Sequence, residues 1–230
     1  MNWMKKVAVA LVCLLPLGLQ AAKVDTLQVK SPSMNKSIEV VVVSPDVAVT
    51  KACPVIYLLH GYGGNARTWV GIKPDLSKIA DEKGIFFVCP DGKNTWYWDS
   101  PLNADVRYET FISDELVKYV DSHYKTVADR KGRAITGLSM GGHGAMWNGL
   151  RHSDVFSAAG STSGGVDIRP FPKNWEMSVQ IGEKAQYPEN WEKYTVINLV
   201  PTLRKDQIAL IFDCGDSDFF LEVNKNYHEA

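Results

Sequence analysis

The sequence predicts a single α/β domain built on a mostly parallel, doubly wound sheet. Short continuous apolar runs recur along the chain, as expected of strands that are buried on both faces of a parallel sheet. Segments with helical spacing separate these runs, and this alternation predicts right-handed βαβ units. The composition agrees, because 45% of the 230 residues are hydrophobic and 22% are charged, which is typical of a globular domain and not of a disordered or collagen-like chain.

The expected strands precede and then alternate with the helices. The first two are separated by the turn-like Ser31-Pro32-Ser33, which predicts an N-terminal antiparallel hairpin. In chain order, the expected strands are Thr26–Val29, Ile38–Val43, Val55–Leu59, Ile85–Val88, Arg133–Thr136 and Ile208–Phe212.

Four helices are expected at Pro74–Glu82, Arg107–Tyr124, Met140–Arg151 and Phe219–Ala230. In the second, Phe111, Leu116, Val117 and Val120 share an apolar face, and Glu109 is expected to point away from it. Residues 164–201 interrupt the alternation with prolines and aromatic residues. They are expected to form an excursion over the edge or top of the sheet, with short helices near Trp175–Ile181 and Trp191–Leu199.

The first 22 residues are predicted to be a secretory signal peptide, followed by one domain over residues 23–230. Lys5 and Lys6 precede an apolar run from Val7 to Leu19, and the small residues Ala21 and Ala22 follow. The apolar run is too short to span a bilayer, which takes about 20 residues, so no membrane span is expected after removal of the signal. A retained membrane anchor is the alternative. We expect a secreted or periplasmic protein.

Charge and cysteine content narrow the possible partners. With 25 basic and 26 acidic residues the net charge is −1, so a nucleic-acid partner is not expected. The histidines are scattered and there is no CxxC motif, so neither a metal nor an organic cofactor is expected. Cys53, Cys89 and Cys214 each flank or end an apolar run and are expected to be thiols, with a Cys53–Cys89 disulfide left open. The oligomeric state is not predicted.

The segment Gly137-Leu138-Ser139-Met140-Gly141 fits the pattern G-x-S-x-G. An expected strand precedes it and an expected helix follows, which is the setting of a nucleophile elbow, a strained turn that exposes a serine. Free N–H groups at the start of the helix could stabilise an oxyanion. Ser139 is therefore the candidate nucleophile. The alternative is a glycine-rich helix start without chemistry.

A second glycine-rich segment, His60-Gly61-Tyr62-Gly63-Gly64, follows the Val55–Leu59 strand. In enzymes with a nucleophile elbow, a loop at this place supplies one oxyanion N–H, and the residue after the serine supplies the other. The backbone N–H groups of Tyr62 and Met140 are therefore the predicted oxyanion hole. We expect His60 to brace the loop through hydrogen bonds. A glycine-rich strand–helix turn without catalytic function is the alternative.

Further motifs occur in a fixed order with these two segments: Pro90-Asp91-Gly92, Trp96-Tyr97-Trp98-Asp99-Ser100, Tyr108-Glu109-Thr110 and Asp213-Cys214-Gly215. Together they resemble the esterase D-type esterases of the α/β-hydrolase superfamily, a group that includes S-formylglutathione hydrolases, feruloyl and acetylxylan esterases of carbohydrate esterase family 1, and mycolyltransferase-like proteins. The resemblance extends from about Ile38 to Ala230. It implies an α/β-hydrolase fold and a serine acyl-enzyme.

The sequence offers candidates for the acid of the implied triad but none at the expected position of its base. Three acids, Asp213, Asp216 and Asp218, follow the last expected strand, and any of them could lie at the carboxyl edge of the sheet. The family pattern D-x-G-x-x-D-x-F places the triad acid at Asp218. The resemblance places the triad histidine a few tens of residues after the acid, beyond another strand.

Only twelve residues follow Asp218, and none of the five histidines fits the position of the base. We therefore expect a domain that is incomplete at its C-terminus, without the last strand and helix of the fold, and with severely impaired activity. Alternatively, His60, His143 or a partner chain supplies the base.

Aromatic residues suggest the substrate class. Trp96 and Trp98 follow the Ile85–Cys89 strand on the expected catalytic side, where exposed rings would suit a sugar or feruloyl ring. Packing of the long loops is the alternative. With the signal peptide, the predicted function is an exported serine carboxylesterase that cleaves acyl or feruloyl esters of a polysaccharide. Two alternatives remain: a non-catalytic hydrolase fold that binds glycan through its aromatic residues, and an acyltransferase on the same scaffold.

Overall fold

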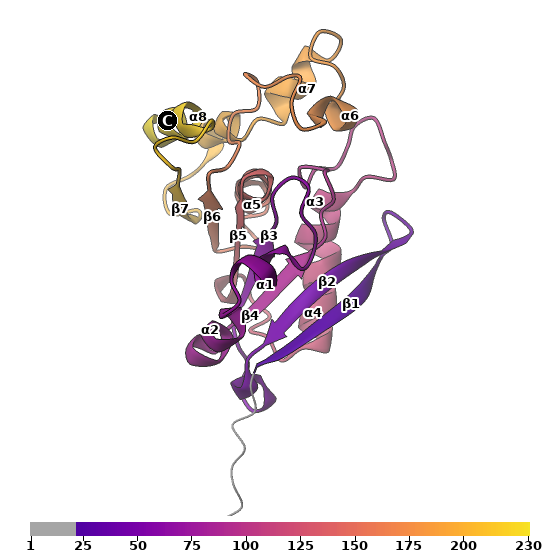
Figure 1. The fold of residues 1–230 in the computed structure, drawn as a ribbon, viewed down its shortest axis with the longest axis vertical. Coiled ribbons are helices and arrows are strands. Elements are labelled where there is room, and N and C mark those ends of the chain that lie inside the picture. Colours follow the sequence, from indigo (N-terminus) through magenta and orange to yellow (C-terminus); the bar gives the residue numbers. More distant parts are fainter. Residues whose placement is uncertain (1–21) are drawn as a thin grey trace, which may run out of the picture.

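The computed structural model describes residues 22–230, so the predicted signal peptide lies outside the described residues except for Ala22. A seven-stranded sheet forms its centre, with the order β1-β2-β4-β3-β5-β6-β7 (Figure 1). The strands are β1 (Lys23–Ser31), β2 (Lys36–Ser44), β3 (Val55–Leu59), β4 (Phe86–Pro90), β5 (Arg133–Leu138), β6 (Ala158–Thr162) and β7 (Ala209–Asp213).

Strand pairing confirms the predicted mixed sheet. β1 and β2 form the antiparallel hairpin, and β2 pairs antiparallel with β4. All other pairs are parallel, with Leu59 of β3 and Ser161 of β6 on either side of Gly137 in β5. The carboxyl ends of these parallel strands therefore meet at one edge, where open α/β sheets bind their ligands.

The helices also follow the prediction closely. The expected helix 107–124 forms as α3 (Tyr108–Thr110), one π-helical turn at Phe111–Glu115 and α4 (Leu116–His123). The others are α1 (Thr68–Ile72), α2 (Leu76–Lys83), α5 (Met140–Arg151), α6 (Met177–Ile181), α7 (Pro188–Lys193) and α8 (Leu221–Glu229), with 3₁₀ turns at Asp46–Val49, Arg130–Gly132 and Val196–Thr202.

Helices cover the sheet on two faces. On one face, α2 packs through Leu76 and Ala80 against an apolar cluster that includes Val41 and Phe87. On the other, α4 and α5 border the larger core, which contains most of the buried aromatic side chains. The segment between β6 and β7, orange in Figure 1, lies beyond the strand ends, as the predicted excursion requires.

Glu109 corrects one sequence prediction. The carboxylate is buried and not solvent-facing, because three donors converge on it: Trp147 Nε1 at 2.7 Å, and Arg151 Nε and His152 Nε2 at 2.8 Å. The π-helical turn that follows shifts the helix register, which explains why the next apolar residue after Phe111 on the same face is Leu116. Burial opposes the charge, but the donors outweigh it and hold the pKa of Glu109 below its ordinary value.

Two elements escaped the sequence prediction. Strand β6 has the sequence Ala-Ala-Gly-Ser-Thr, which lacks the β-branched and aromatic run typical of a strand. Helix α1 is only five residues long. Cys53 and Cys89 are buried free thiols and Cys214 is a half-buried one, as predicted, so the Cys53–Cys89 disulfide does not form. Within residues 22–230, no helix is both long and apolar enough to cross a membrane.

Candidate active site

Ser139 lies on the turn that joins β5 to α5, as the G-x-S-x-G motif predicts. Its backbone has φ 54° and ψ −118°, a conformation that costs energy for a residue with a side chain. Its N–H donates to Thr162 O at 2.8 Å, and its C=O accepts from His143 N–H at 3.0 Å. These bonds hold the strained turn in place, which is the arrangement of a nucleophile elbow.

Two glycines of the motif are required by close backbone approach. A Cβ on Gly141 would lie 2.2 Å from Leu59 O, and a Cβ on Gly137 would lie 2.3 Å from Gly141 O. No side chain fits at either position, so the first turn of α5 can pack directly on β3 and β5. This packing fixes the direction in which the turn presents Ser139.

The loop after β3 approaches the same turn. A Cβ on Gly61 would lie 3.5 Å from the Ser139 Cβ, so the two segments are in contact. Neither the Tyr62 N–H nor the Met140 N–H donates a hydrogen bond to any residue of the described part of the chain. The predicted oxyanion donors are thus unengaged beside the serine.

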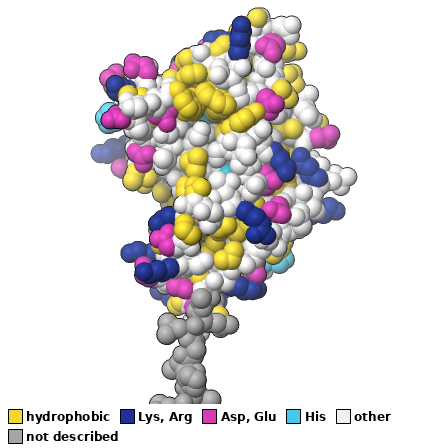
Figure 2. Space-filling view, in the orientation of Figure 1, with side chains coloured by type: hydrophobic (Ala, Val, Ile, Leu, Met, Phe, Trp, Pro, Cys, Tyr) yellow, Lys and Arg dark blue, Asp and Glu magenta, His cyan; other side chains and the backbone are white. Residues whose placement is uncertain are grey.

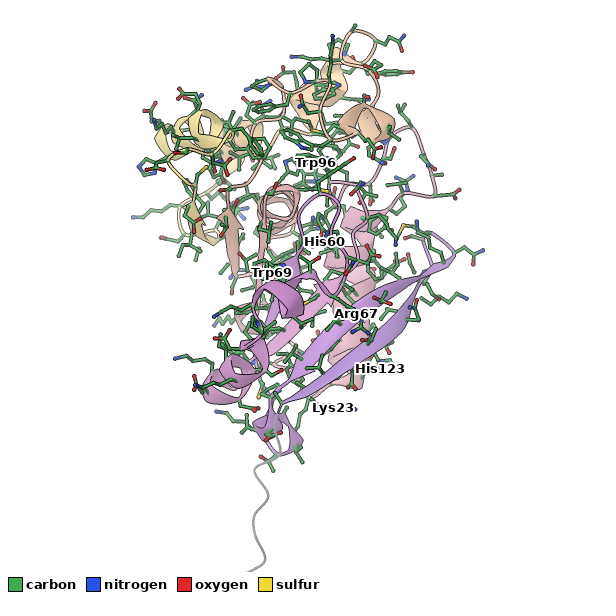
Figure 3. The ribbon with its side chains drawn as sticks, viewed as in Figure 1. Lys23, His60, Arg67, Trp69, Trp96 and His123 are labelled. Atoms are coloured by element: carbon green, nitrogen blue, oxygen red, sulfur yellow. The ribbon has the colours of Figure 1, made fainter. Side chains whose placement is uncertain are left out.

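His60 braces this loop rather than facing the serine. Its Nδ1 is 2.8 Å from Gly61 O, and its Nε2 accepts from Gly92 N–H at 2.9 Å. The Tyr97 hydroxyl donates to His60 O at 3.0 Å. Figure 3 shows His60 in the middle of the molecule, between the strand ends and the upper loops. Both ring nitrogens are occupied, as expected of a brace and not of a free base.

Asp91 extends the brace toward the surface. Its Oδ1 lies 3.5 Å from His60 Nε2, and its Oδ2 lies 2.6 Å from Lys93 Nζ. Burial opposes the ionisation of Asp91, but His60 and Lys93 outweigh it and hold the pKa of this carboxyl well below its usual range. Asn94 Oδ1 then accepts from Gly63 N–H at 2.9 Å, which ties the two loops together.

The predicted triad acid, Asp218, lies in the loop between β7 and α8. It is half-buried, and its Oδ1 accepts from Phe220 N–H at 2.8 Å, in a turn that leads into α8. Asp213 and Asp216 are exposed. No histidine in residues 22–230 is hydrogen-bonded to Asp218.

All five histidines of the chain are described, and no histidine ring is hydrogen-bonded to Ser139, which His143 reaches only through its backbone N–H. Besides His60, the buried His143 accepts from Trp98 Nε1 at 2.8 Å and lies 2.8 Å from Gly165 O through Nδ1. Complete burial lowers the pKa of His143 from 6.5 to about 4, so the ring is neutral at pH 7. The other three lie at Glu109 (His152), beside Tyr119 (His123) and at the exposed end of α8 (His228).

Trp96 and Trp98 correct the expectation of exposed substrate-binding rings. Both are at most 1% exposed, because they stack on each other with ring centres 5.7 Å apart and enclose His143. Trp96 also donates to Trp175 O at 3.2 Å. These side chains therefore pack the long loops, which was the alternative interpretation. Figure 3 shows Trp96 directly under the upper segment.

Other aromatic residues are exposed instead. Phe219 is 61% exposed and stacks on Trp175 at 5.2 Å between ring centres, and Tyr62 is 37% exposed. The Glu176 carboxylate beside the Tyr62 hydroxyl raises the pKa of Tyr62, so the predicted oxyanion loop (His60–Gly64) meets the excursion here. Apolar side chains gather on this upper part of the surface in Figure 2. Sequence reasoning passed over Phe219 because it lies within the expected last helix.

Backbone strain is concentrated around this site. Besides Ser139, the residues Trp96, Tyr97, Ser163 and Trp175 have positive φ without being glycine, and so does Glu176. Strained residues persist where the surrounding structure determines them, and they cluster at functional sites. Within residues 22–230 no group of three or more His, Cys, Asp or Glu side chains could hold a metal ion.

The doubly wound sheet and the serine elbow at its carboxyl edge define an α/β-hydrolase fold. Solved structures agree: a ferulic acid esterase matches with TM-score 0.73 and 29% identity over 91% of this chain and 85% of its own. An S-formylglutathione hydrolase from Agrobacterium tumefaciens matches in fold, with TM-score 0.75 and 22% identity over 91% and 82% of the two chains.

The family follows from the sequence comparison. The chain belongs to the family described as “Putative esterase”, whose model matches residues 31–230. An esterase of Mycobacterium tuberculosis is 35% identical over 123 residues, which cover 50% of this chain and 26% of the relative. An acetyl esterase of Caldicellulosiruptor saccharolyticus is 25% identical over 189 residues, or 74% and 68% of the two chains. The matched part is thus about a quarter of the mycobacterial relative's length.

Proposed function

We propose that this chain is an exported serine carboxylesterase that acts on acyl or feruloyl esters of carbohydrates. The observation that carries the proposal is the strained elbow at Ser139, flanked by the unengaged N–H groups of Tyr62 and Met140. A serine held in this way needs no cofactor to attack an ester carbonyl.

The chemistry follows from these groups. Ser139 Oγ attacks the acyl carbon and loses its proton, and the carbonyl oxygen becomes an oxyanion that the Tyr62 and Met140 N–H groups stabilise. Collapse of the tetrahedral intermediate expels the alcohol, which takes up a proton, and leaves an acyl group on Ser139. Water then attacks this acyl-enzyme, releases the acid and restores the serine.

The step of this cycle without a positioned catalytic group is the removal of the proton from Ser139 Oγ. No imidazole ring of the chain is hydrogen-bonded to the Ser139 hydroxyl, and solvent bases act far less efficiently than a positioned imidazole. Loss of the histidine from a serine triad costs several orders of magnitude in rate but leaves the contribution of the oxyanion hole. The 230-residue chain is therefore expected to turn over slowly.

The substrate class is supported by likeness and by surface chemistry. Similar proteins bear the names ferulic acid esterase and acetyl esterase. The exposed stack of Trp175 and Phe219 offers an aromatic face on which a sugar or feruloyl ring could pack. Export to a compartment with polysaccharides is expected from the predicted signal peptide at residues 1–22. Amino-terminal sequencing of the exported chain tests this, and a mature chain that still begins at Met1 would contradict it.

Covalent labelling tests the nucleophile. A fluorophosphonate probe should label the folded chain at Ser139, as identified by mass spectrometry of the labelled peptide, and Ser139→Ala should abolish the label. Ser163→Ala is a matched control, because Ser163 also has positive φ at the end of the neighbouring strand. Label that persists in Ser139→Ala would overturn the assignment.

Hydrolysis tests the function itself. The chain should hydrolyse acetyl and feruloyl model esters slowly but above background, and Ser139→Ala should lower this rate, by less than it would in a complete triad because no positioned base activates the serine. Equal rates for the chain and for Ser139→Ala would contradict the proposed function. Activity on acylated oligosaccharides but not on long-chain glycerides would support the carbohydrate assignment.

A further inference from the structure

A polar cavity that does not include Ser139 lies beside the predicted oxyanion loop. Its volume is about 480 Å³, enough for one or two sugar rings, and it lies between the β1–β2 hairpin, the loop after β3 and the loop after β4. The lining residues are Gln28, Lys36, Ser37, Ile38, Glu39, Asn65, Arg67, Asp91, Lys93 and Tyr108. Amide, hydroxyl and charged groups predominate, which suits a hydroxylated ligand better than an apolar one.

Positive charge exceeds negative charge in this cavity. Three cations line it, against the two carboxylates of Glu39 and Asp91, and Asp91 is already engaged by Lys93 at 2.6 Å. Among the described residues, no carboxylate lies within ion-pair distance of the Arg67 guanidinium, which donates only to Thr26 Oγ1 at 3.0 Å. Arg67 thus has donors to spare, and Figure 3 shows it over the hairpin.

Lys36 is the second cation placed to meet a ligand. Its Nζ lies 5.0 Å from the centre of the Tyr108 ring and donates to Asp105 O at 3.1 Å. Burial lowers the pKa of Lys36, and the charge of Lys93 adds to this effect although Asp105 opposes it. An anionic ligand in the cavity would relieve the repulsion between Lys36 and Lys93.

The cavity lies next to the loops of the candidate active site. Asn65 follows the oxyanion loop directly, and its Oδ1 accepts from Arg67 N–H at 2.8 Å. On the other wall, Lys93 precedes Asn94, whose Oδ1 accepts from Gly63 N–H. A chain of sugar rings with one acylated ring at Ser139 could therefore continue across the Gly63–Asn94 contact into the cavity.

We propose that this cavity is a subsite for an acidic sugar, in which Arg67 binds the carboxylate of a uronate residue and Lys36, with the amide and hydroxyl groups, binds hydroxyls of that ring or of the next one. This subsite would make an acidic polysaccharide the substrate of the proposed esterase. Its link to Ser139 rests on the proposed function. Arg67 carries the recognition, since its planar guanidinium can hold a carboxylate through two hydrogen bonds.

Calorimetric titration tests binding without turnover when the Ser139→Ala chain is used. We expect a galacturonate trisaccharide to bind at least tenfold more tightly than its fully methyl-esterified form, with affinity that falls as salt is added. Arg67→Ala should reduce the affinity at least tenfold, and Arg67→Lys should reduce it less. Lys36→Met, which keeps the apolar stem near Tyr108, should also weaken binding.

Lys73→Ala is the matched control. Arg67 precedes helix α1 and Lys73 follows it, but Lys73 is paired at the surface with Asp75. It should leave the affinity unchanged. Equal binding of the charged and the esterified trisaccharide, no effect of Arg67→Ala in a chain of unchanged melting temperature, or equally tight binding of inorganic phosphate would each overturn the proposal. Because no outcome depends on catalysis, failure here is distinguishable from failure of the proposed esterase activity.

Discussion

Two regions at the carboxyl ends of the parallel strands are built very differently. We call them the serine edge, where Ser139 joins β5 to α5, and the acid edge, which comprises β7 and the loop that carries Asp218. At the serine edge, glycines 137 and 141 leave no room for a Cβ, and the N–H of Ser139 is fixed by Thr162 O. At the acid edge, β7 has Leu210 and Ile211 exposed, the latter at 75%, and within the described residues the Asp218 carboxylate is hydrogen-bonded only to the backbone of its own turn. The difference teaches that the candidate nucleophile is positioned by packing on several strands, whereas the hydrogen bond that holds the candidate acid comes from its own turn.

The glycines offer the sharpest contrast between the two edges. Gly141→Ala places a Cβ 2.2 Å from the backbone oxygen of Leu59, so we expect a loss of about 4 kcal/mol or more, or failure to fold. Gly215→Ala meets nothing closer than 3.8 Å and should change the free energy of unfolding by less than about 0.5 kcal/mol. Chemical denaturation of both variants measures this, and similar losses at the two positions would break the comparison.

The histidines near the two edges should differ in their effect on the pH dependence of stability. Because burial lowers the pKa of His143 from 6.5 to about 4, the unfolded chain binds an extra proton between these values. Its neutral ring therefore contributes full stability above pH 6.5, and about 3 kcal/mol is lost as the pH falls from 7 to 4.

Denaturation of the chain and of His143→Gln at pH 7 and pH 4 checks this expectation. The difference in the free energy of unfolding between the unchanged chain and His143→Gln should be about 3 kcal/mol smaller at pH 4 than at pH 7. His228→Gln, on the exposed end of α8, is the control and should shift neither value by more than about 0.5 kcal/mol. A difference for His143→Gln that is independent of pH would show that the pKa of His143 is not lowered in the folded chain.

The two aspartates provide the smallest contrast. Asp91→Asn should cost about 2 kcal/mol at pH 7, because it removes the charged bond to Lys93 from a buried carboxyl. The pKa of Asp91 is lowered, so its contribution is present above about pH 4 and is lost as the pH falls through the folded-state pKa.

Asp218→Asn is the matched variant at the acid edge. The amide oxygen can still accept from Phe220 N–H, so the free energy of unfolding should change by less than about 0.5 kcal/mol. Thermal unfolding between pH 3 and pH 8 measures both variants. If Asp218→Asn were the more destabilising of the two, the acid edge would be held more firmly than the structure indicates.

The sequence predicted what local patterns determine. Ser139 was found because a glycine-flanked serine between a strand and a helix has few other uses, and β3 was recognised because its residues are uniformly apolar. The positions of Trp96 and Trp98 could not be predicted in the same way. Their burial depends on a positive φ at Trp96 and on the excursion that covers them, which are tertiary features.

Glu109 and β6 also could not be predicted from local patterns. A glutamate in an amphipathic helix is expected at the surface, and only the convergence of Trp147, Arg151 and His152 from α5 and its end explains its burial. Strand β6 is made of small residues and forms because β5 and β7 pair with it on both sides. In both cases the determining contacts come from segments distant in sequence.

The central claim is that Ser139 is positioned and flanked by oxyanion donors but served by none of the five histidines. The most direct test is the hydrolysis of 4-nitrophenyl acetate by the chain with increasing imidazole, corrected for the rate of Ser139→Ala. We predict a Ser139-dependent turnover below about 0.01 s⁻¹, against a typical enzyme value near 10 s⁻¹, that rises with imidazole because the free base replaces the missing one. A turnover of about 1 s⁻¹ or more without imidazole, abolished by substitution of a histidine of the chain, would contradict the claim.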